Sequence, residues 1–239
     1  MSLSRLLDEY YGIKKYSVKF LGGRMNENWL IQTQDDSFVL RHQKYRPLGM
    51  EYILGFCDFL KYMGMPVAKP IPNRYGKYMT AYENNFFVLF TFAKGRVPKT
   101  ITTKLLDDMA KILSQMHRAG VQWSTLHPPP KVRLLHKRMR DAFTHEYSME
   151  YPAKSFLRYI MWPFYRPATS IAKKIDEKIA NIQLPCTIIH GDFHRGNLLV
   201  NEHGEITALL DFDNSVYGYR VYDIATAVAW MIIENTPTS

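Results

Sequence analysis

The stretch HGDFHRGN at residues 190–197, followed by DFD at residues 211–213, says more about fold and function than any other part of the chain. Phosphoryl transfer needs a carboxylate that accepts or orients the proton of an attacking hydroxyl, and metal ions that bridge the phosphates. Asp192 can supply the carboxylate, while Asn197 and Asp211 offer the oxygen ligands that Mg²⁺ prefers. The alternative is a set of ordinary turn residues, because Asp, Gly and Asn all favour turns.

The sequence around these motifs predicts short strands that bring them together. Runs at Leu198–Val200 and Thr207–Leu210 flank the turn residues Asn-Glu-His-Gly and predict a hairpin. Such a hairpin returns Asp211 to the side of the 190–197 loop. Leu184–His190 is typical of a buried strand, and Tyr222–Ile233 of an apolar helix.

The first ninety residues predict an antiparallel sheet with one main helix. Apolar residues at helical spacing predict the helix at Met50–Met63, ended by Gly64, and a shorter helix at Leu3–Tyr11. Prolines at positions 66, 70 and 72 predict an extended segment after the main helix. Short runs rich in aromatic and β-branched residues predict five strands: Tyr16–Leu21, Asn28–Thr33, Ser37–His42, Tyr78–Tyr82 and Asn85–Phe92.

From Thr100 onward the sequence changes to helical patterns. Leu105–Arg118 has one apolar face, with Thr102 and Thr103 as candidate caps, and a proline-rich loop is expected at Gly120–Pro130. Residues 131–182 are basic, aromatic and helical, divided by prolines at positions 152, 163 and 167. The chain as a whole therefore predicts an α+β fold with a boundary near residues 92–95.

Composition limits the class of protein. The chain has 239 residues, of which 46% are hydrophobic and 22% charged, as in ordinary globular proteins. The two cysteines have no metal-ligand or redox spacing, so two reduced thiols are expected. No secretory signal is present, and the longest apolar run, Ile224–Ile233, is too short to span a bilayer. We expect a soluble, cytoplasmic protein without a membrane partner.

The two motifs together resemble the aminoglycoside phosphotransferase and choline kinase family, in which His-Gly-Asp-x-x-x-x-Asn precedes Asp-x-Asp. Eukaryotic-type protein kinases have Arg and Gly where this chain has Gly191 and Asp213. The resemblance implies a two-lobed protein-kinase-like fold, with a nucleotide-binding lobe at residues 1–92 and a larger, mostly helical catalytic lobe at residues 93–239. It also implies transfer of the γ-phosphate of ATP, with Mg²⁺, to a hydroxyl of a small-molecule alcohol.

The resemblance also implies a role for individual residues. Asp192 would be the catalytic base. The metal ligands would be Asn197, Asp211 and Asp213, and the nucleotide-binding residues would be Gly22, Gly23, Asn26, Arg41, Glu51, Phe90 and Phe92.

Some of these assignments had structural alternatives. Glu51 would pair with Arg41 or else stabilise the start of a helix. His117, His190 and Asp223 are expected to support the catalytic loop rather than to react.

The sequence says less about the small molecule that accepts the phosphate. Residues 131–140 contain five Lys or Arg and no acid, in the region where family members build the acceptor pocket. A polycationic aminoglycoside would be repelled there, so neutral or anionic alcohols are expected. A solvated helix face is the alternative, and the aromatic residues that follow would also suit a quaternary ammonium group.

Two further classes stay open at this level. Family members usually continue for several helices after Asp-x-Asp, whereas this chain ends 26 residues after Asp213, so the second lobe is expected to be shortened. A kinase-like scaffold with little catalysis, such as a spore-coat protein, is the main alternative function. The net charge of +9 would suit a nucleic acid, but no RNA-recognition or helix-turn-helix signature is present, so no nucleic-acid partner is expected.

Overall fold

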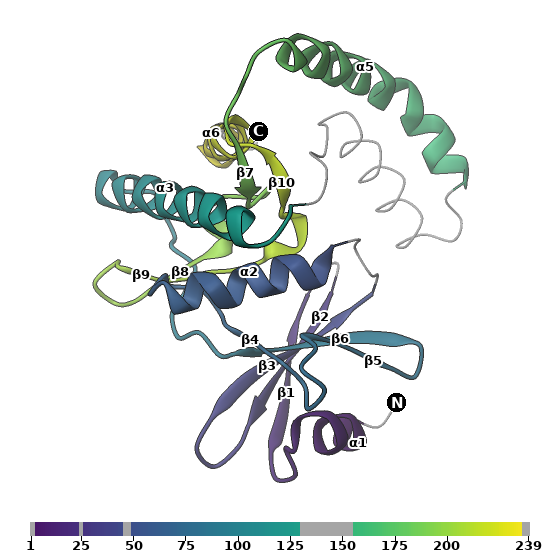
Figure 1. Ribbon diagram of the computed structural model, residues 1–239, viewed down its shortest axis with the longest axis vertical. Coiled ribbons are helices and arrows are strands. Elements are labelled where there is room, and N and C mark those ends of the chain that lie inside the picture. Colours follow the sequence, from purple (N-terminus) through teal and green to yellow (C-terminus); the bar gives the residue numbers. More distant parts are fainter. Residues whose placement is uncertain (1–2, 24–25, 45–48, 130–154, 236–239) are drawn as a thin grey trace.

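The computed structural model describes residues 3–23, 26–44, 49–129 and 155–235. It has the α+β architecture that the sequence predicts, with an antiparallel sheet in the N-terminal part and helices over most of the C-terminal part (Figure 1). The basic stretch at residues 131–140 lies outside the described residues. None of the helices in the described ranges is both long and apolar enough to cross a membrane.

The N-terminal sheet has six strands, one more than predicted. Neighbours in the sheet follow the order β1-β2-β3-β6-β4, with β5 also paired to β6, and every pairing is antiparallel. The additional strand, β4, contains Pro70 and lies at an edge of the sheet, where a residue without an N–H is tolerated. The strands are β1 Ser17–Gly22, β2 Glu27–Gln32, β3 Ser37–Gln43, β4 Pro70–Ile71, β5 Met79–Tyr82 and β6 Asn85–Thr91.

Alternation along β6 gives the sheet two apolar faces. Phe87 and Leu89 belong to a cluster with Leu6 and Leu7, from helix α1 (Leu3–Leu6) and the single π-turn after it (Leu7–Tyr11). Val88, between them, faces a second cluster on the opposite side. Helix α1 thus closes one face of the sheet, and helix α2 closes the other.

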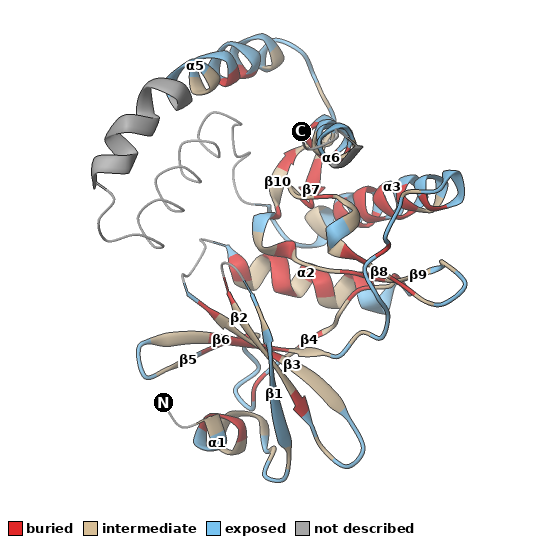
Figure 2. Cartoon of the chain, turned by 180° about the vertical axis from the view of Figure 1, so that it is seen from behind, coloured by how far each residue is buried: buried red, intermediate tan, exposed pale blue. Residues whose placement is uncertain are grey.

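Helix α2, Met50–Tyr62, connects the sheet to the rest of the chain. Met50 and Leu54 pack against the sheet. Other residues of the same helix, Phe56 and Leu60 among them, join the largest core cluster together with helix α3, Thr103–Leu126 (Figure 2). The sheet and the C-terminal elements therefore share one helix as a common layer.

Helix α3 is longer than predicted. It begins where expected, since the Thr102 hydroxyl accepts the Leu105 N–H at 3.1 Å. It continues to Leu126, so the loop predicted from Gly120 is wrong for its first seven residues. Gly120 lies in the helix against strand β7, where a Cβ would collide with the hydroxyl of Thr187. This glycine allows close packing instead of ending the helix.

The C-terminal part is built around two small antiparallel pairs of strands. Strand β7 pairs with β10, which was not predicted, and β8 pairs with β9 as the predicted hairpin. Helix α5 runs unbroken through Pro163 and Pro167, so the prediction that these prolines divide it is wrong; each proline removes only one backbone donor. The elements are α5 Ser155–Ala180, β7 Cys186–Ile189, β8 Leu198–Val200, β9 Ile206–Leu209, β10 Val216–Tyr219 and α6 Val221–Asn235.

Candidate active site

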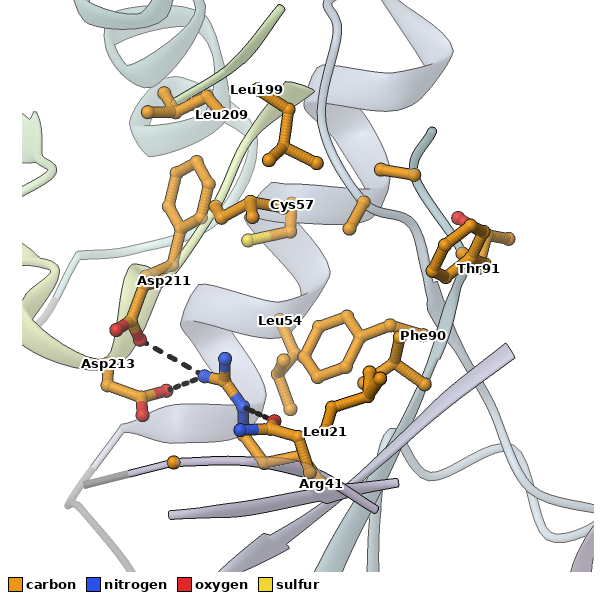
Figure 3. Close-up of a pocket in the computed structure, with 18 of the residues that line it drawn as sticks. Leu21, Arg41, Leu54, Cys57, Phe90, Thr91, Leu199, Leu209, Asp211 and Asp213 are labelled. Atoms are coloured by element: carbon orange, nitrogen blue, oxygen red, sulfur yellow. Dashed lines mark hydrogen bonds and ion pairs between the residues drawn. The ribbon is translucent and has the colours of Figure 1, made fainter. Parts of the chain in front are cut away.

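A cavity of about 420 Å³ is enclosed by the sheet, helix α2 and the β8–β9 hairpin (Figure 3). Its wall is mainly apolar, with charged groups only at one end. The apolar wall is formed by residues from strands, helix and hairpin, including Leu21, Val39, Leu54, Cys57, Phe90, Leu199 and Leu209. Burial raises the pKa of the Cys57 thiol, so this thiol is a neutral part of the wall.

The polar end of the cavity consists of Arg41 and two aspartates. Arg41 Nη1 lies 3.1 Å from Asp211 Oδ1 and 3.0 Å from Asp213 Oδ1, and Nε donates to Asn28 Oδ1 at 3.1 Å. Burial raises the pKa of Asp213, an effect that Arg41 opposes; burial would lower the pKa of Arg41, but the two carboxylates outweigh it. One fixed cation therefore holds two carboxylates side by side.

The segment after β1 bends into the cavity wall at two glycines. Gly22 and Gly23, which the sequence predicts to bind nucleotide, both line the cavity, and both have positive φ. At Gly23, with φ 142°, an added Cβ would lie 1.8 Å from the carbonyl oxygen of Asn26. Only glycine fits there, so the backbone can approach the cavity closely.

Two residues predicted to bind nucleotide do not line this cavity. Asn26 is buried and donates its side-chain N–H to Asp213 Oδ2, while its Oδ1 accepts the Lys44 N–H at 3.2 Å. Glu51 was expected to pair with Arg41, and the structure does not form that pair. Glu51 instead accepts the backbone N–H groups of Tyr78, at 3.3 Å, and Met79, at 2.8 Å, and so ties α2 to β5.

The loop that carries Asp192 lies next to the aspartates. Asn197 donates its side-chain N–H to the Asp192 carbonyl at 2.8 Å and to Asp192 Oδ2 at 3.3 Å. The backbone carbonyl of Asn197 accepts the Leu210 N–H at 2.8 Å, directly before Asp211. Asp211 has left-handed backbone angles, φ 64° and ψ 67°, which are uncommon outside glycine and cluster at functional sites.

A buried carboxylate, that of Asp223, holds the beginning of the 190–197 loop by hydrogen bonds. Asp223, at the start of α6, is fully buried and accepts the backbone N–H groups of His190, at 2.8 Å, and Gly191, at 2.7 Å. His117 Nε2 lies 2.8 Å from the same carboxylate. The supporting role predicted for Asp223 and His117 is confirmed.

His190 has a supporting role too. Its Nε2 lies 2.9 Å from the carbonyl of Leu210, and its Nδ1 accepts the Asp192 N–H at 3.3 Å. Because a backbone carbonyl only accepts, Nε2 carries the proton. Burial lowers the pKa of His190, so the ring stays neutral while it links the 190–197 loop to Leu210, directly before the 211–213 segment.

The oxygen atoms near Arg41 suit a hard divalent cation. Among the described residues no three His, Cys, Asp or Glu side chains form a metal cluster, so protein carboxylates alone do not form a complete site. Asp211 and Asp213 offer two carboxylates, and Asn197 an amide oxygen. Mg²⁺ typically takes only one or two protein carboxylates and completes its shell with phosphate oxygens and water. The residues therefore fit a metal that arrives with a phosphate ligand.

The chain has the features of kinase-like phosphotransferases. A small antiparallel sheet shares a helix with the C-terminal elements, and the apolar cavity between them ends in Arg41, Asp211 and Asp213. The Asp-x-x-x-x-Asn loop lies beside this charged end. A family model identifies the group within this class. Residues 18–238 match the phosphotransferase enzyme family, and the chain belongs to that family.

Curated relatives cover most of the chain at low identity. A homoserine kinase of Caulobacter sp. (strain K31) is 25% identical over 231 residues, which are 90% of this chain and 65% of the relative. A hydroxylysine kinase of Danio rerio is 26% identical over 199 residues, 74% of this chain and 53% of the relative. The chain thus spans less than two thirds of the length of these relatives.

A solved structure confirms the fold. The amicoumacin kinase hAmiN, in complex with AMP-PNP, Ca²⁺ and Ami, aligns with a TM-score of 0.71 at 17% identity, covering 98% of this chain and 70% of that one. At this identity the similarity demonstrates the kinase-like fold.

Replacing Asp223 with Asn tests the support of the loop. The amide N–H₂ of asparagine would face backbone N–H groups of His190 or Gly191 that now donate to the Asp223 carboxylate. Buried N–H groups would then lack an acceptor. We expect the free energy of unfolding to fall by roughly 3 kcal/mol, measured by urea denaturation. Asp107→Asn, at an exposed site on α3, is the matched control, and an equal effect of both changes would contradict the prediction.

Proposed function

We propose that this chain transfers the γ-phosphate of ATP, with Mg²⁺, to a hydroxyl group of a small molecule. The observation that carries the proposal is the convergence of three features at one place. The apolar cavity ends at Arg41 and its two aspartates, and the Asn197–Leu210 hydrogen bond joins those aspartates to the loop of Asp192. An apolar slot, a cation with paired carboxylates, and a candidate base are the parts that phosphoryl transfer uses.

The adenine ring would occupy the apolar part of the cavity. Phe90, Phe92 and Leu209 provide apolar walls, and Thr91 and Ala93 line the cavity beside them. The phosphates would then extend toward Gly22, Gly23 and Arg41. The complex of hAmiN with AMP-PNP supports nucleotide binding by this chain.

The charged end would hold the metal and the phosphates together. Asp211, Asp213 and Asn197 would contribute oxygen ligands to Mg²⁺, which when bound neutralises phosphate charge. Arg41 would contact the phosphates, where its planar group suits paired oxygens. Asn26 would act indirectly: it does not line the cavity, and its hydrogen bond holds Asp213 in place.

Asp192 would act on the acceptor hydroxyl. Its carboxylate accepts N–H groups from Asn197 and Trp230, which fix its direction while leaving lone pairs for another donor. A carboxylate so placed can orient the hydroxyl and take its proton as the oxygen attacks the γ-phosphate.

The relatives narrow the acceptor to a class. The names of both curated relatives specify hydroxylated amino acids, homoserine and hydroxylysine. We propose a small hydroxylated amine or amino acid as the acceptor of this chain. Homoserine has no net charge at neutral pH, in agreement with the preference for neutral or anionic acceptors predicted from residues 131–140, which lie outside the described part of the chain. Hydroxylysine and simple amino alcohols carry one net positive charge, so they depart from that preference, although by much less than a polycationic aminoglycoside.

Replacing Asp192 with Asn removes the proposed base and keeps the shape of the side chain. We expect kcat to fall by about 10²-fold or more, while ATP affinity measured by calorimetry changes less than about twofold, because the cavity is untouched. Glu202→Asn, at an exposed turn of the hairpin, is the control. Full turnover in the Asp192 variant would rule out its role as base.

Replacing Asp211 with Ala removes one proposed metal ligand. We expect ATP binding measured with Mg²⁺ to weaken by about tenfold or more, and the gain in affinity that Mg²⁺ gives the wild type to be lost. Titrations with and without Mg²⁺ measure both quantities, with Asp107→Ala as control. An unchanged response to Mg²⁺ would contradict the assignment.

A panel of acceptors tests the substrate class. With Mg²⁺ and ATP, ADP release should give a higher kcat/KM for homoserine, hydroxylysine or simple amino alcohols than for kanamycin-like aminoglycosides. The reason is that a polycation needs an acidic pocket, whereas residues 131–140 are basic. Efficient phosphorylation of an aminoglycoside, with weak turnover of the small acceptors, would contradict it.

A further inference from the structure

We propose that Trp230, on helix α6, is a positioning residue that sets the direction of the Asp192 carboxylate. The inference rests on the proposed function, since it concerns the base of that reaction. The sequence motifs gave no role to Trp230, which lies 38 residues beyond Asp192 in an apolar helix. Its contacts, the position of its helix and the chemistry of indole support the role.

The first observation is a hydrogen bond to the base. Trp230 Nε1 donates to Asp192 Oδ1 at 3.2 Å, while Asn197 donates to Oδ2 at 3.3 Å. The two carboxylate oxygens are therefore held from two different elements, α6 and the catalytic loop. A carboxylate fixed at both oxygens cannot rotate freely about its χ2 bond.

The second observation is a ring stack that holds the indole in place. The rings of Trp230 and His194 lie with centroids 4.5 Å apart and planes inclined by 21°. His194 Nδ1 accepts the Gly196 N–H at 3.1 Å, and its Nε2 lies 3.7 Å from Asp192 Oδ2. Trp230 thus braces a second side chain beside the same carboxylate.

The third observation is that α6 is anchored by the carboxylate that supports the loop. Asp223, Ala227 and Trp230 follow the spacing i, i+4 and i+7, so they share one face of α6. Asp223 and Ala227 on that face are buried, whereas Ile224 and Val228 are 54% and 50% exposed. The bonds from Asp223 to His190 and Gly191 therefore also fix where Trp230 meets Asp192.

The chemistry of indole suits this task. Its N–H is a donor only and does not titrate, so it orients a carboxylate without competing for the proton of the acceptor. A lysine or arginine in the same place would add a full charge and make the carboxylate a weaker base. Trp230 supplies direction and leaves Asp192 basic.

The experiment replaces Trp230 with Phe in the full chain and measures turnover with ATP, Mg²⁺ and the best acceptor of the panel. Phe retains a ring to stack on His194 and loses the N–H. We expect kcat to fall about tenfold or more, because small misplacement of a reacting group is costly, with KM for ATP within about twofold of wild type. Trp29→Phe, in strand β2, is the matched control.

A double-mutant cycle separates this proposal from the proposed function. If Trp230 acts through Asp192, Trp230→Phe should reduce turnover in the wild type and have no further effect in Asp192→Asn. An unchanged kcat in Trp230→Phe, a rise in KM alone, or an equal loss in both backgrounds would overturn the positioning role. Full turnover in Asp192→Asn would instead overturn the assignment of Asp192 as the base, and the absence of ATP-dependent turnover in the wild type would overturn the proposed function.

Tryptophan emission provides a readout that needs neither turnover nor a Trp230 variant. Asp192→Ala removes the acceptor of the indole N–H, so the emission of the protein should change in intensity or maximum, whereas Glu202→Ala should leave it unchanged. Identical spectra for wild type and Asp192→Ala would overturn the contact on which the proposal rests, even if Trp230→Phe failed to fold.

Discussion

The candidate site depends on a single buried carboxylate, that of Asp223. It holds two successive backbone N–H groups at His190 and Gly191 and faces His117, so it joins helix α6, the catalytic loop and helix α3. An unpaired charge at a fully buried position would be very unfavourable, but the Asp223 carboxylate accepts hydrogen bonds on both of its oxygens. This contact fixes the first residues of the loop relative to both helices. It thereby helps to place Asp192 and Trp230 beside each other.

The second organising element is helix α2, which the sheet and the C-terminal elements share. One side of it packs against β5 and β6, and another side enters the main core with α3. Because Leu54 and Cys57 of this helix also line the cavity, the apolar wall is part of the core and not an addition to it. The cavity therefore retains its shape only if both parts of the chain stay packed on the same helix.

Much of this arrangement could be predicted from the sequence, and the failures have physical causes. The motifs at 190–197 and 211–213 are local, so the spacing of Asp192 and Asn197 and the return of the β8–β9 hairpin were predictable. Strand β10 was missed because its pairing with β7 joins segments separated by the catalytic loop and the hairpin. The expected pair of Glu51 with Arg41 does not form, because helical spacing does not say which neighbouring strand the start of a helix contacts. Glu51 contacts β5 instead. Trp230 shares a helical face with Asp223, and that spacing was the available signal.

The contact of Arg41 with Asp211 and Asp213 has a consequence for the order in which ligands reach the site. In the free chain these carboxylates already have a cation between them, with Arg41 mostly buried. A divalent ion arriving alone would meet carboxylates whose charge Arg41 already partly neutralises. A nucleotide carrying its own ion supplies phosphate oxygens for Arg41 at the same moment, so the exchange conserves charge pairing throughout. On the proposed function, the chain thus favours the metal–nucleotide complex over the free ion.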